Sequence, residues 1–179
     1  RWFTRYLHGI ENGVEEDAKA WIVRENDDKL NPTPYKDYPN PEATDVTLYL
    51  EGGAPEKGGL STEKKPAQGV ETLVDNFSFS GETLAKAENT NHRLLYVTPT
   101  LTKDIHLSGT SKISIAVASN KAAANFSVWL VSLPWNDGKN VKITDNIITR
   151  GWADPQNYSS ITHSEPLVPG QFYNLTFDL

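Results

Sequence analysis

Hydrophobic positions follow two periods along the chain, one confined to the first residues and the other covering most of the remainder. Trp2, Phe3, Tyr6 and Leu7 share one face of a helix, and Gly9 is placed to end it. We therefore predict a short N-terminal helix followed by a turn. Beyond this turn the dominant period is two, which is typical of strands.

Short alternating runs separated by turn-forming residues predict about nine strands. They are expected at residues 20–23, 45–51, 70–80, 94–98, 105–107, 112–119, 125–133, 141–149 and 173–179. Residues 31–41 and 52–69, rich in Pro or Gly, are expected to be surface loops, and Asn136-Asp137-Gly138 predicts a turn. This spacing predicts a mainly β fold, an antiparallel jelly-roll sandwich with a short N-terminal helix.

Composition and charge exclude several classes of partner. The net charge is −6, and Lys64-Lys65 is the longest basic run, so a nucleic-acid partner is not expected. No run approaches the roughly 20 apolar residues of a membrane helix, so no membrane partner is expected either. The chain has no cysteine, which fits a reducing, cytoplasmic location. It also has no Met, which indicates a segment of a longer protein.

Familiar catalytic patterns are missing from the sequence. It has no Gly-x-Ser-x-Gly nucleophile elbow, and adjacent residues such as His163 and Ser164 point apart. The glycines of residues 53–59 lack the Lys and Ser/Thr of a phosphate loop. Asp104 and His106 could share a strand face, but no third metal ligand has suitable spacing. We therefore expect no catalytic residue, no metal site and no cofactor in this chain.

The tryptophans are the remaining candidates for binding. Trp129 lies in the middle of a predicted strand and is expected in the core. Trp135 and Trp152 lie in or next to predicted turns, where an indole ring can be exposed and can stack on a sugar. Packing of these rings on another domain or on their own core is the alternative. A carbohydrate-binding module is therefore one interpretation of the sequence.

Two stretches resemble a known family. Residues 2–14, with Trp2, Tyr6, Gly9 and Asn12-Gly13, resemble the junction before the C-terminal domain of bacterial Xaa-Pro dipeptidyl-peptidases. These are serine hydrolases related to cocaine esterase and the α-amino acid ester hydrolases. Residues 148–157 and 163–179 are similar to the dipeptidyl-peptidase branch, although the esterase branch shares the architecture.

The resemblance implies that this chain belongs to a larger enzyme with separate catalytic and non-catalytic domains. Residues 1–13 would end a preceding α/β-hydrolase domain that holds the catalytic Ser, Asp and His. Residues 14–179 would form a C-terminal jelly roll, similar to galactose-binding folds, which in the family continues past residue 179. This non-catalytic domain would pack on the catalytic domain of the same chain and shape it. The parent enzyme would release N-terminal Xaa-Pro dipeptides, and it could form a homodimer; this chain alone would be inactive.

Overall fold

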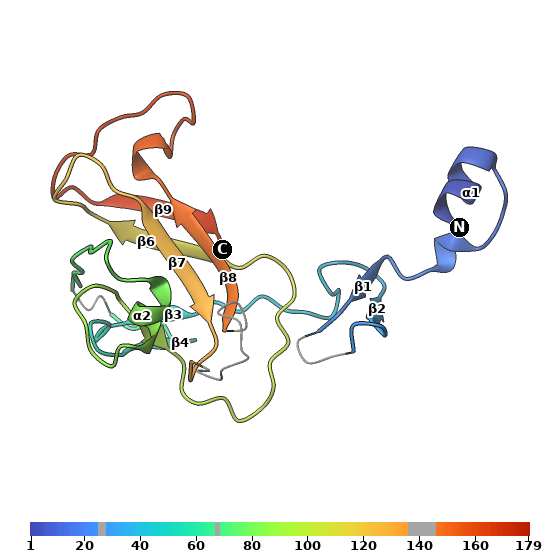
Figure 1. Cartoon of the computed structure of the whole chain (residues 1–179), viewed down its shortest axis with the longest axis horizontal. Coiled ribbons are helices and arrows are strands. Elements are labelled where there is room, and N and C mark those ends of the chain that lie inside the picture. Colours follow the sequence, from blue (N-terminus) through green and yellow to red (C-terminus); the bar gives the residue numbers. More distant parts are fainter. Residues whose placement is uncertain (25–27, 67–68, 136–145) are drawn as a thin grey trace. The chain divides into compact units, whose positions relative to one another are not determined.

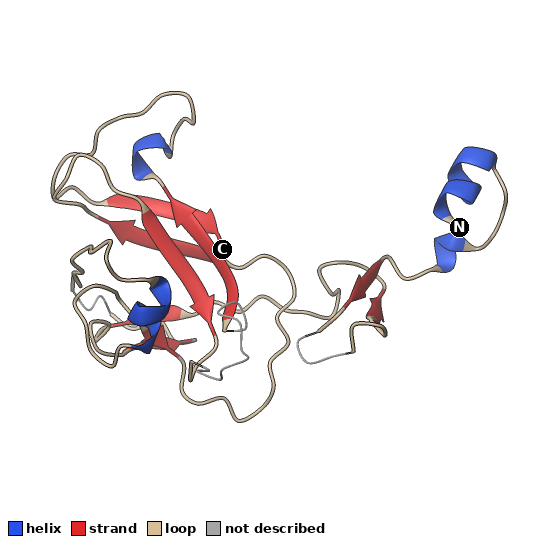
Figure 2. Ribbon diagram, viewed as in Figure 1, coloured by secondary structure: helices blue, strands red, loops and turns tan. Residues whose placement is uncertain are grey.

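The computed structural model describes residues 1–24, 28–66, 69–135 and 146–179. It is mainly β, with few helical turns (Figure 1, Figure 2). The chain forms two compact units: unit 1 consists of residues 1–45 and 104–109, and unit 2 of residues 46–103 and 110–179. The mainly β class expected from the sequence is thus confirmed.

Unit 1 begins with helix α1 (Trp2–His8), as the sequence predicts. The helix ends at Gly9, whose φ of 68° lies in the left-handed region that glycine adopts without strain. A short 3-10 helix, η1 (Val14–Glu16), leads into strand β1 (Ala20–Ile22), which pairs antiparallel with β2 (Thr33–Tyr35).

Strand β2 lies inside the segment that we expected to be an irregular loop, so that expectation was wrong. Pro34 sits in the strand opposite Trp21. A proline cannot donate to a strand ladder, but both strands of a two-stranded sheet are edge strands, and such a strand tolerates proline.

Unit 1 is discontinuous in sequence, because residues 104–109 return to it. The backbone N–H of Asn40 donates to Ser108 Oγ at 2.9 Å, and the rings of Tyr35 and His106 lie 6.0 Å apart. The strand that we predicted at residues 105–107 does not form. The side chains of His106 and Ser108 contact residues 35 and 40 of unit 1, and the segment does not extend a sheet.

Unit 2 contains the remaining strands in three sheets. Their bounds are β3 (Tyr49–Glu51), β4 (Gly58–Ser61), β5 (Tyr96–Val97), β6 (Lys112–Val117), β7 (Phe126–Val131), β8 (Ile147–Ala153) and β9 (Tyr173–Asp178). The sheet orders are β3-β4-β5, β6-β9 and β7-β8, and every pair is antiparallel except β4 with β5. Helix α2 (Gly81–Lys86) and the 3-10 helix η3 (Pro155–Asn157) complete the unit.

Part of the core of unit 2 lies where β8 approaches β9. Leu175 in β9 is 2% exposed and pairs with Ile115 of β6. A Cβ on Gly151 in β8 would lie 2.1 Å from the backbone oxygen of Asp178. Only glycine lets the two backbones approach this closely.

Several predicted elements differ from the structure. Residues 70–80 form no strand, and α2 begins directly after them at Gly81, capped by Ser80, whose hydroxyl accepts from Thr83 N. Strand β4 occupies part of the expected loop 52–69, while β3 and β5 are shorter than predicted. Strand β8 extends through Trp152, so this residue lies in a strand, next to the helical turn at residues 155–157. The predicted turn at residues 136–138 lies outside the described residues.

Candidate functional site

The most ordered polar cluster of unit 2 surrounds the turn at residues 53–58. Glu71 Oε1 accepts hydrogen bonds from the backbone N–H groups of Gly53 (2.6 Å) and Ala54 (2.9 Å). Its Oε2 accepts from the Tyr96 hydroxyl at 2.7 Å. Ala54 is fully buried between these groups. One carboxylate therefore fixes the start of the turn and joins it to β5.

Arg93 holds the same turn from its carbonyl side. Its Nη1 lies 3.1 Å from each of three backbone oxygens, those of Ala54, Pro55 and Glu56. Its Nε donates to Leu84 O and its Nη2 to Ala87 O, both near the end of α2. The residue is only 9% exposed. Arg93 thus satisfies carbonyls of both the turn and the helix end.

The surroundings of Glu71, Tyr96 and Arg93 shift the pKa of each side chain, and the contacts described above explain the directions. Desolvation acts to raise the pKa of Glu71, but the hydrogen bonds from Tyr96, Ala54 and Gly53 outweigh it, so this pKa lies below its ordinary value. Burial, followed by the hydrogen bond to Glu71, raises the pKa of Tyr96. Burial lowers the pKa of Arg93. We infer an ionised Glu71 and a neutral Tyr96 at neutral pH.

The polar cluster is suited to fixing the backbone. Both oxygens of Glu71 and all three nitrogens of Arg93 have partners within the chain. The sequence analysis missed both residues, because lone charged residues beside a strand pattern carry no motif. The one available signal was the charge of Glu71 within the apolar run 70–80.

The two candidate tryptophans lie at different ends of the β7–β8 pair. Trp152 pairs with Ser127 near the start of β7 and is 72% exposed. Trp135 is half-buried and follows the far end of β7, four residues beyond Val131. Strand geometry puts about 13 Å between the levels of Ser127 and Val131. The structure therefore does not assemble the two rings into one platform at the strand pair.

Trp129 is half-buried, less deeply than expected, and contacts residues of β7, β8 and α2. Its indole N–H donates to Ser127 Oγ at 3.0 Å, and the Arg150 guanidinium lies 6.0 Å from the ring centre. A Cβ on Gly81 would meet this ring at 2.0 Å, so the first residue of α2 packs directly against it.

The remaining sequence candidates are not assembled into a site. Asp104 is exposed, and His106 contacts the ring of Tyr35. His163 and Ser164 are both exposed, and no hydrogen bond joins their side chains, which belong to the described part of the chain. Within the described ranges no three His, Cys, Asp or Glu side chains gather as metal ligands. No helix among these residues is long and apolar enough to span a bilayer.

Large apolar side chains are exposed at many described positions, and two stretches of the chain concentrate them. They are the α1 set (Trp2, Phe3, Tyr6 and Leu7) and the 70–79 strip (Val70, Leu73, Val74, Phe77 and Phe79).

By its fold this chain is a mainly β protein whose best-defined polar cluster serves to fix a turn. A family model described as "X-Pro dipeptidyl-peptidase C-terminal non-catalytic domain" matches residues 12–179. The chain therefore belongs to the family of C-terminal non-catalytic domains of X-Pro dipeptidyl-peptidases, as the sequence resemblance indicated.

Curated relatives agree with this membership. A protein of Rhodopirellula baltica named "Putative Xaa-Pro dipeptidyl-peptidase" is 62% identical over 179 residues, which are the whole of this chain and 29% of the relative. A Bacillus anthracis protein of the same name is 34% identical and is covered to 28%. The Xaa-Pro dipeptidyl-peptidase of Lacticaseibacillus rhamnosus is 24% identical and is covered to 26%. The chain thus spans less than a third of these relatives, at their C-terminal end.

Proposed function

We propose that this chain packs on and shapes the catalytic domain of a serine peptidase that releases N-terminal Xaa-Pro dipeptides. The observation that carries the proposal is the match of the whole chain to the C-terminal part of relatives named Xaa-Pro dipeptidyl-peptidase. In this proposal an α/β-hydrolase domain earlier in the same chain supplies the serine nucleophile and forms the acyl-enzyme. The relatives' names favour the peptidase branch over the esterase branch.

The α1 set supports a partner domain at the N-terminal end. All four side chains are more than half exposed, although the rings of Trp2 and Tyr6 contact each other with centres 4.6 Å apart. An apolar helix face of this kind normally packs on another surface.

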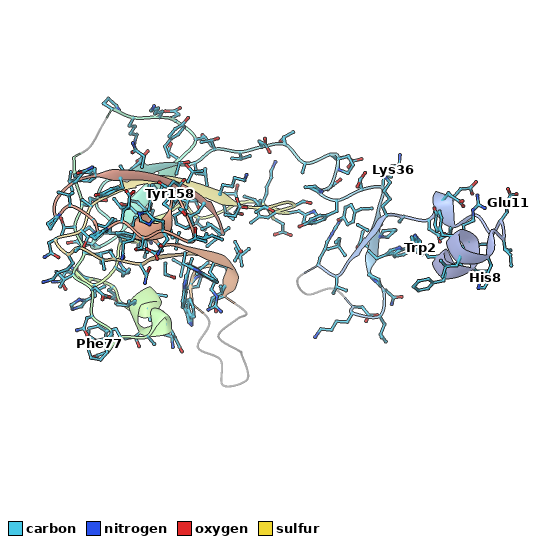
Figure 3. All side chains as sticks on the ribbon, turned by 90° about the horizontal axis from the view of Figure 1, so that it is seen from above. Trp2, His8, Glu11, Lys36, Phe77 and Tyr158 are labelled. Atoms are coloured by element: carbon cyan, nitrogen blue, oxygen red, sulfur yellow. The ribbon has the colours of Figure 1, made fainter. Side chains whose placement is uncertain are left out.

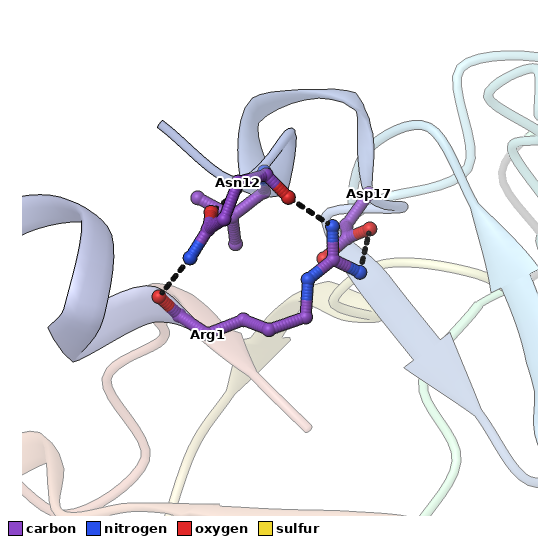
Figure 4. Close-up of polar contacts among 4 residues, drawn as sticks. Arg1, Asn12 and Asp17 are labelled. Carbon is purple, nitrogen blue, oxygen red and sulfur yellow. Dashed lines mark hydrogen bonds and ion pairs between the residues drawn. The ribbon is translucent and has the colours of Figure 1, made fainter. Parts of the chain in front are cut away.

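The polar side of α1 is already engaged within unit 1 (Figure 4). Arg1 Nη1 contacts Asp17 Oδ1 at 2.9 Å, and Arg1 Nη2 donates to Asn12 O at 2.7 Å. Asn12 Nδ2 donates back to Arg1 O at 2.9 Å, and Arg5 pairs with Glu15. These contacts leave the apolar face of α1 free, and the family match begins at residue 12. We therefore assign residues 1–13 to the edge of the hydrolase domain and residues 14–179 to the accessory domain.

The finer architecture belongs to the same proposal. Antiparallel pairs β6-β9 and β7-β8, with β8 against β9, are compatible with part of a jelly-roll sandwich similar to galactose-binding folds. The absence of cysteine from the sequence fits a cytoplasmic enzyme. A homodimeric parent enzyme is also part of the proposal.

Turnover by the full-length protein tests the proposed function. We expect the full-length protein to release p-nitroaniline from Ala-Pro-p-nitroanilide and to release intact Xaa-Pro dipeptides from longer peptides. The 179-residue chain should do neither. Hydrolysis of simple esters without cleavage after Xaa-Pro would instead place the protein in the esterase branch.

Carbohydrate binding is the second candidate, favoured by the exposure of Trp152. An indole ring on a strand face can stack on a sugar ring. Isothermal titration of the 179-residue chain with oligosaccharides would show saturable binding that Trp152→Ala abolishes. A Trp135→Ala variant examines the other candidate ring separately.

A further inference from the structure

The 70–79 strip carries the most exposed aromatic ring of the described residues. Phe77 is 96% exposed, and Val70, Leu73, Val74 and Phe79 are each at least 40% exposed. The sequence pattern of this strip is that of a half-buried strand, yet the strip pairs with no strand of the described residues. Its apolar side chains therefore have the spacing of a packed element without the cover that such an element requires.

The strip is held in place by contacts with residues 90–92, so its exposure does not result from fraying. Val74 N donates to Asn91 O at 2.7 Å, and His92 Nδ1 lies 2.7 Å from Val74 O. The rings of Phe79 and His92 have centres 5.0 Å apart. Both ends of the turn that carries Phe77 are therefore fixed on unit 2.

The turn itself is also hydrogen-bonded. Asn76 Oδ1 accepts from Ser78 N at 3.0 Å, and Asn76 O accepts from Phe79 N at 3.2 Å. Phe77 occupies the tip between these contacts, at the periphery of its unit (Figure 3). A fixed, projecting phenyl ring loses little conformational freedom when it enters a pocket, which is typical of interface anchors.

We propose that the 70–79 strip docks into an apolar pocket on the part of the full-length protein that precedes Arg1, with Phe77 as the anchor. The proposal rests on the proposed function for the existence of that part. In the relatives the chain covers less than a third of the length and matches the C-terminal end, so a large preceding segment is available as the occupant.

Charge favours this occupant over a lipid surface. The strip contains the acidic residues Glu71 and Asp75 and no Lys or Arg. Peripheral membrane segments combine apolar anchors with basic residues, because the lipid surface is negatively charged. The docking surface is distinct from the α1 set, which belongs to unit 1, whereas the strip belongs to unit 2.

Hydroxyl-radical footprinting compares the full-length protein with the 179-residue chain. We expect oxidation of Phe77 to be about tenfold slower in the full-length protein, which requires docking to be favoured by only about 1.4 kcal/mol. Ile161 is the matched control, because it is 95% exposed and also lies in unit 2. Its oxidation rate should be equal in the two proteins.

Two variants separate docking from folding. Phe77→Asp and Ile161→Asp should leave the melting temperature of the 179-residue chain unchanged, because both side chains are almost fully exposed. In the full-length protein, Phe77→Asp should return the oxidation rates of Val70 and Leu73 to those of the 179-residue chain. Ile161→Asp should leave these two rates at their full-length values.

The outcomes distinguish the proposed occupant from others. Equal oxidation rates of Phe77 in both proteins would overturn the proposal. Protection of Phe77 that appears only when the 179-residue chain dimerises would also overturn it, and so would protection that appears only on anionic phosphatidylserine vesicles. Turnover of Ala-Pro-p-nitroanilide is measured on the same samples. Protection of Phe77 without turnover would reject the proposed peptidase function and support the docking surface. Turnover without protection of Phe77 would support the peptidase function and reject the docking surface.

Discussion

Replacement of Arg93 tests directly how much its hydrogen bonds stabilise unit 2. Replacement by Met keeps an unbranched apolar side chain of similar length and removes every donor. The backbone oxygens of the turn (Ala54, Pro55, Glu56) and of the end of α2 (Leu84, Ala87) then lose their shared partner. We expect the turn and the helix end to separate, because both are joined through this one side chain.

The magnitude follows from the contacts. A hydrogen bond to a charged group contributes about 1.5–3 kcal/mol, and Arg93 makes such bonds through three nitrogens. Because three oxygens share Nη1 and water can reach part of the opened turn, we expect a total loss of about 3–5 kcal/mol for Arg93→Met. This corresponds to a decrease in melting temperature of about 10 °C. Arg93→Lys should cost about half as much, since a single ammonium cannot reach both groups of carbonyls.

Urea unfolding monitored by tryptophan fluorescence and by circular dichroism measures this loss. Arg150→Met is the control, because Arg150 is exposed and its contact with the Trp129 ring is worth only about 0.5–1 kcal/mol. A free energy of unfolding for Arg93→Met within 1 kcal/mol of this control would refute the inferred role. Loss of cooperativity in both variants would point instead to a general effect of the substitution.

Three further predictions concern stability. The pKa of Glu71 lies below its ordinary value of 4.5. The contribution of Glu71 to the free energy of unfolding is therefore complete above pH 4.5 and is lost as the pH falls through the folded-state pKa. The Glu71→Gln variant should show a smaller loss of stability on the acid side of a stability-against-pH curve. Gly151→Ala should lower the melting temperature more than Gly81→Ala, and thermal melts of the two variants compare them. The methyl group added at residue 151 would meet the backbone of Asp178, whereas the one added at residue 81 would meet the Trp129 ring, which can move. Leu175→Ala should lower the free energy of unfolding by about 3 kcal/mol in urea titrations, and a loss below about 1 kcal/mol would show that the core lies elsewhere.

The elements that the sequence predicted best combine strong alternation with a long antiparallel partner. Strand β6 alternates half-buried and exposed residues along its whole length, and β9 pairs with it over six residues. Strand β7 was also predicted, although its burial does not alternate; it is an apolar run that pairs with β8. In these strands the pattern of side chains and the backbone pairing lead to the same structure.

Elements decided by backbone contacts were not predictable in this way. The pattern of residues 70–80 indicates a strand, but Val74 N donates to Asn91 O in a loop and Glu71 uses its side chain to hold the turn at residues 53–58, so the apolar side chains remain exposed. Strand β4 contains Gly58 and Gly59, whose hydrogens leave room for Glu51 and Tyr96, and neither glycine contributes to a hydrophobic pattern. The binding roles of Trp135 and Trp152 stay predictions, because exposure alone does not identify a ligand.

The return of residues 104–109 to unit 1 limits how this protein can be divided or recombined. A shorter protein that begins at residue 46 would keep this six-residue segment but lose Asn40 and Tyr35, which hold Ser108 and His106. Unit 1 therefore cannot be exchanged as a simple N-terminal cassette, because the chain passes into it a second time. Recombination that preserves the contacts of unit 1 must therefore carry residues 1–45 and 104–109 together.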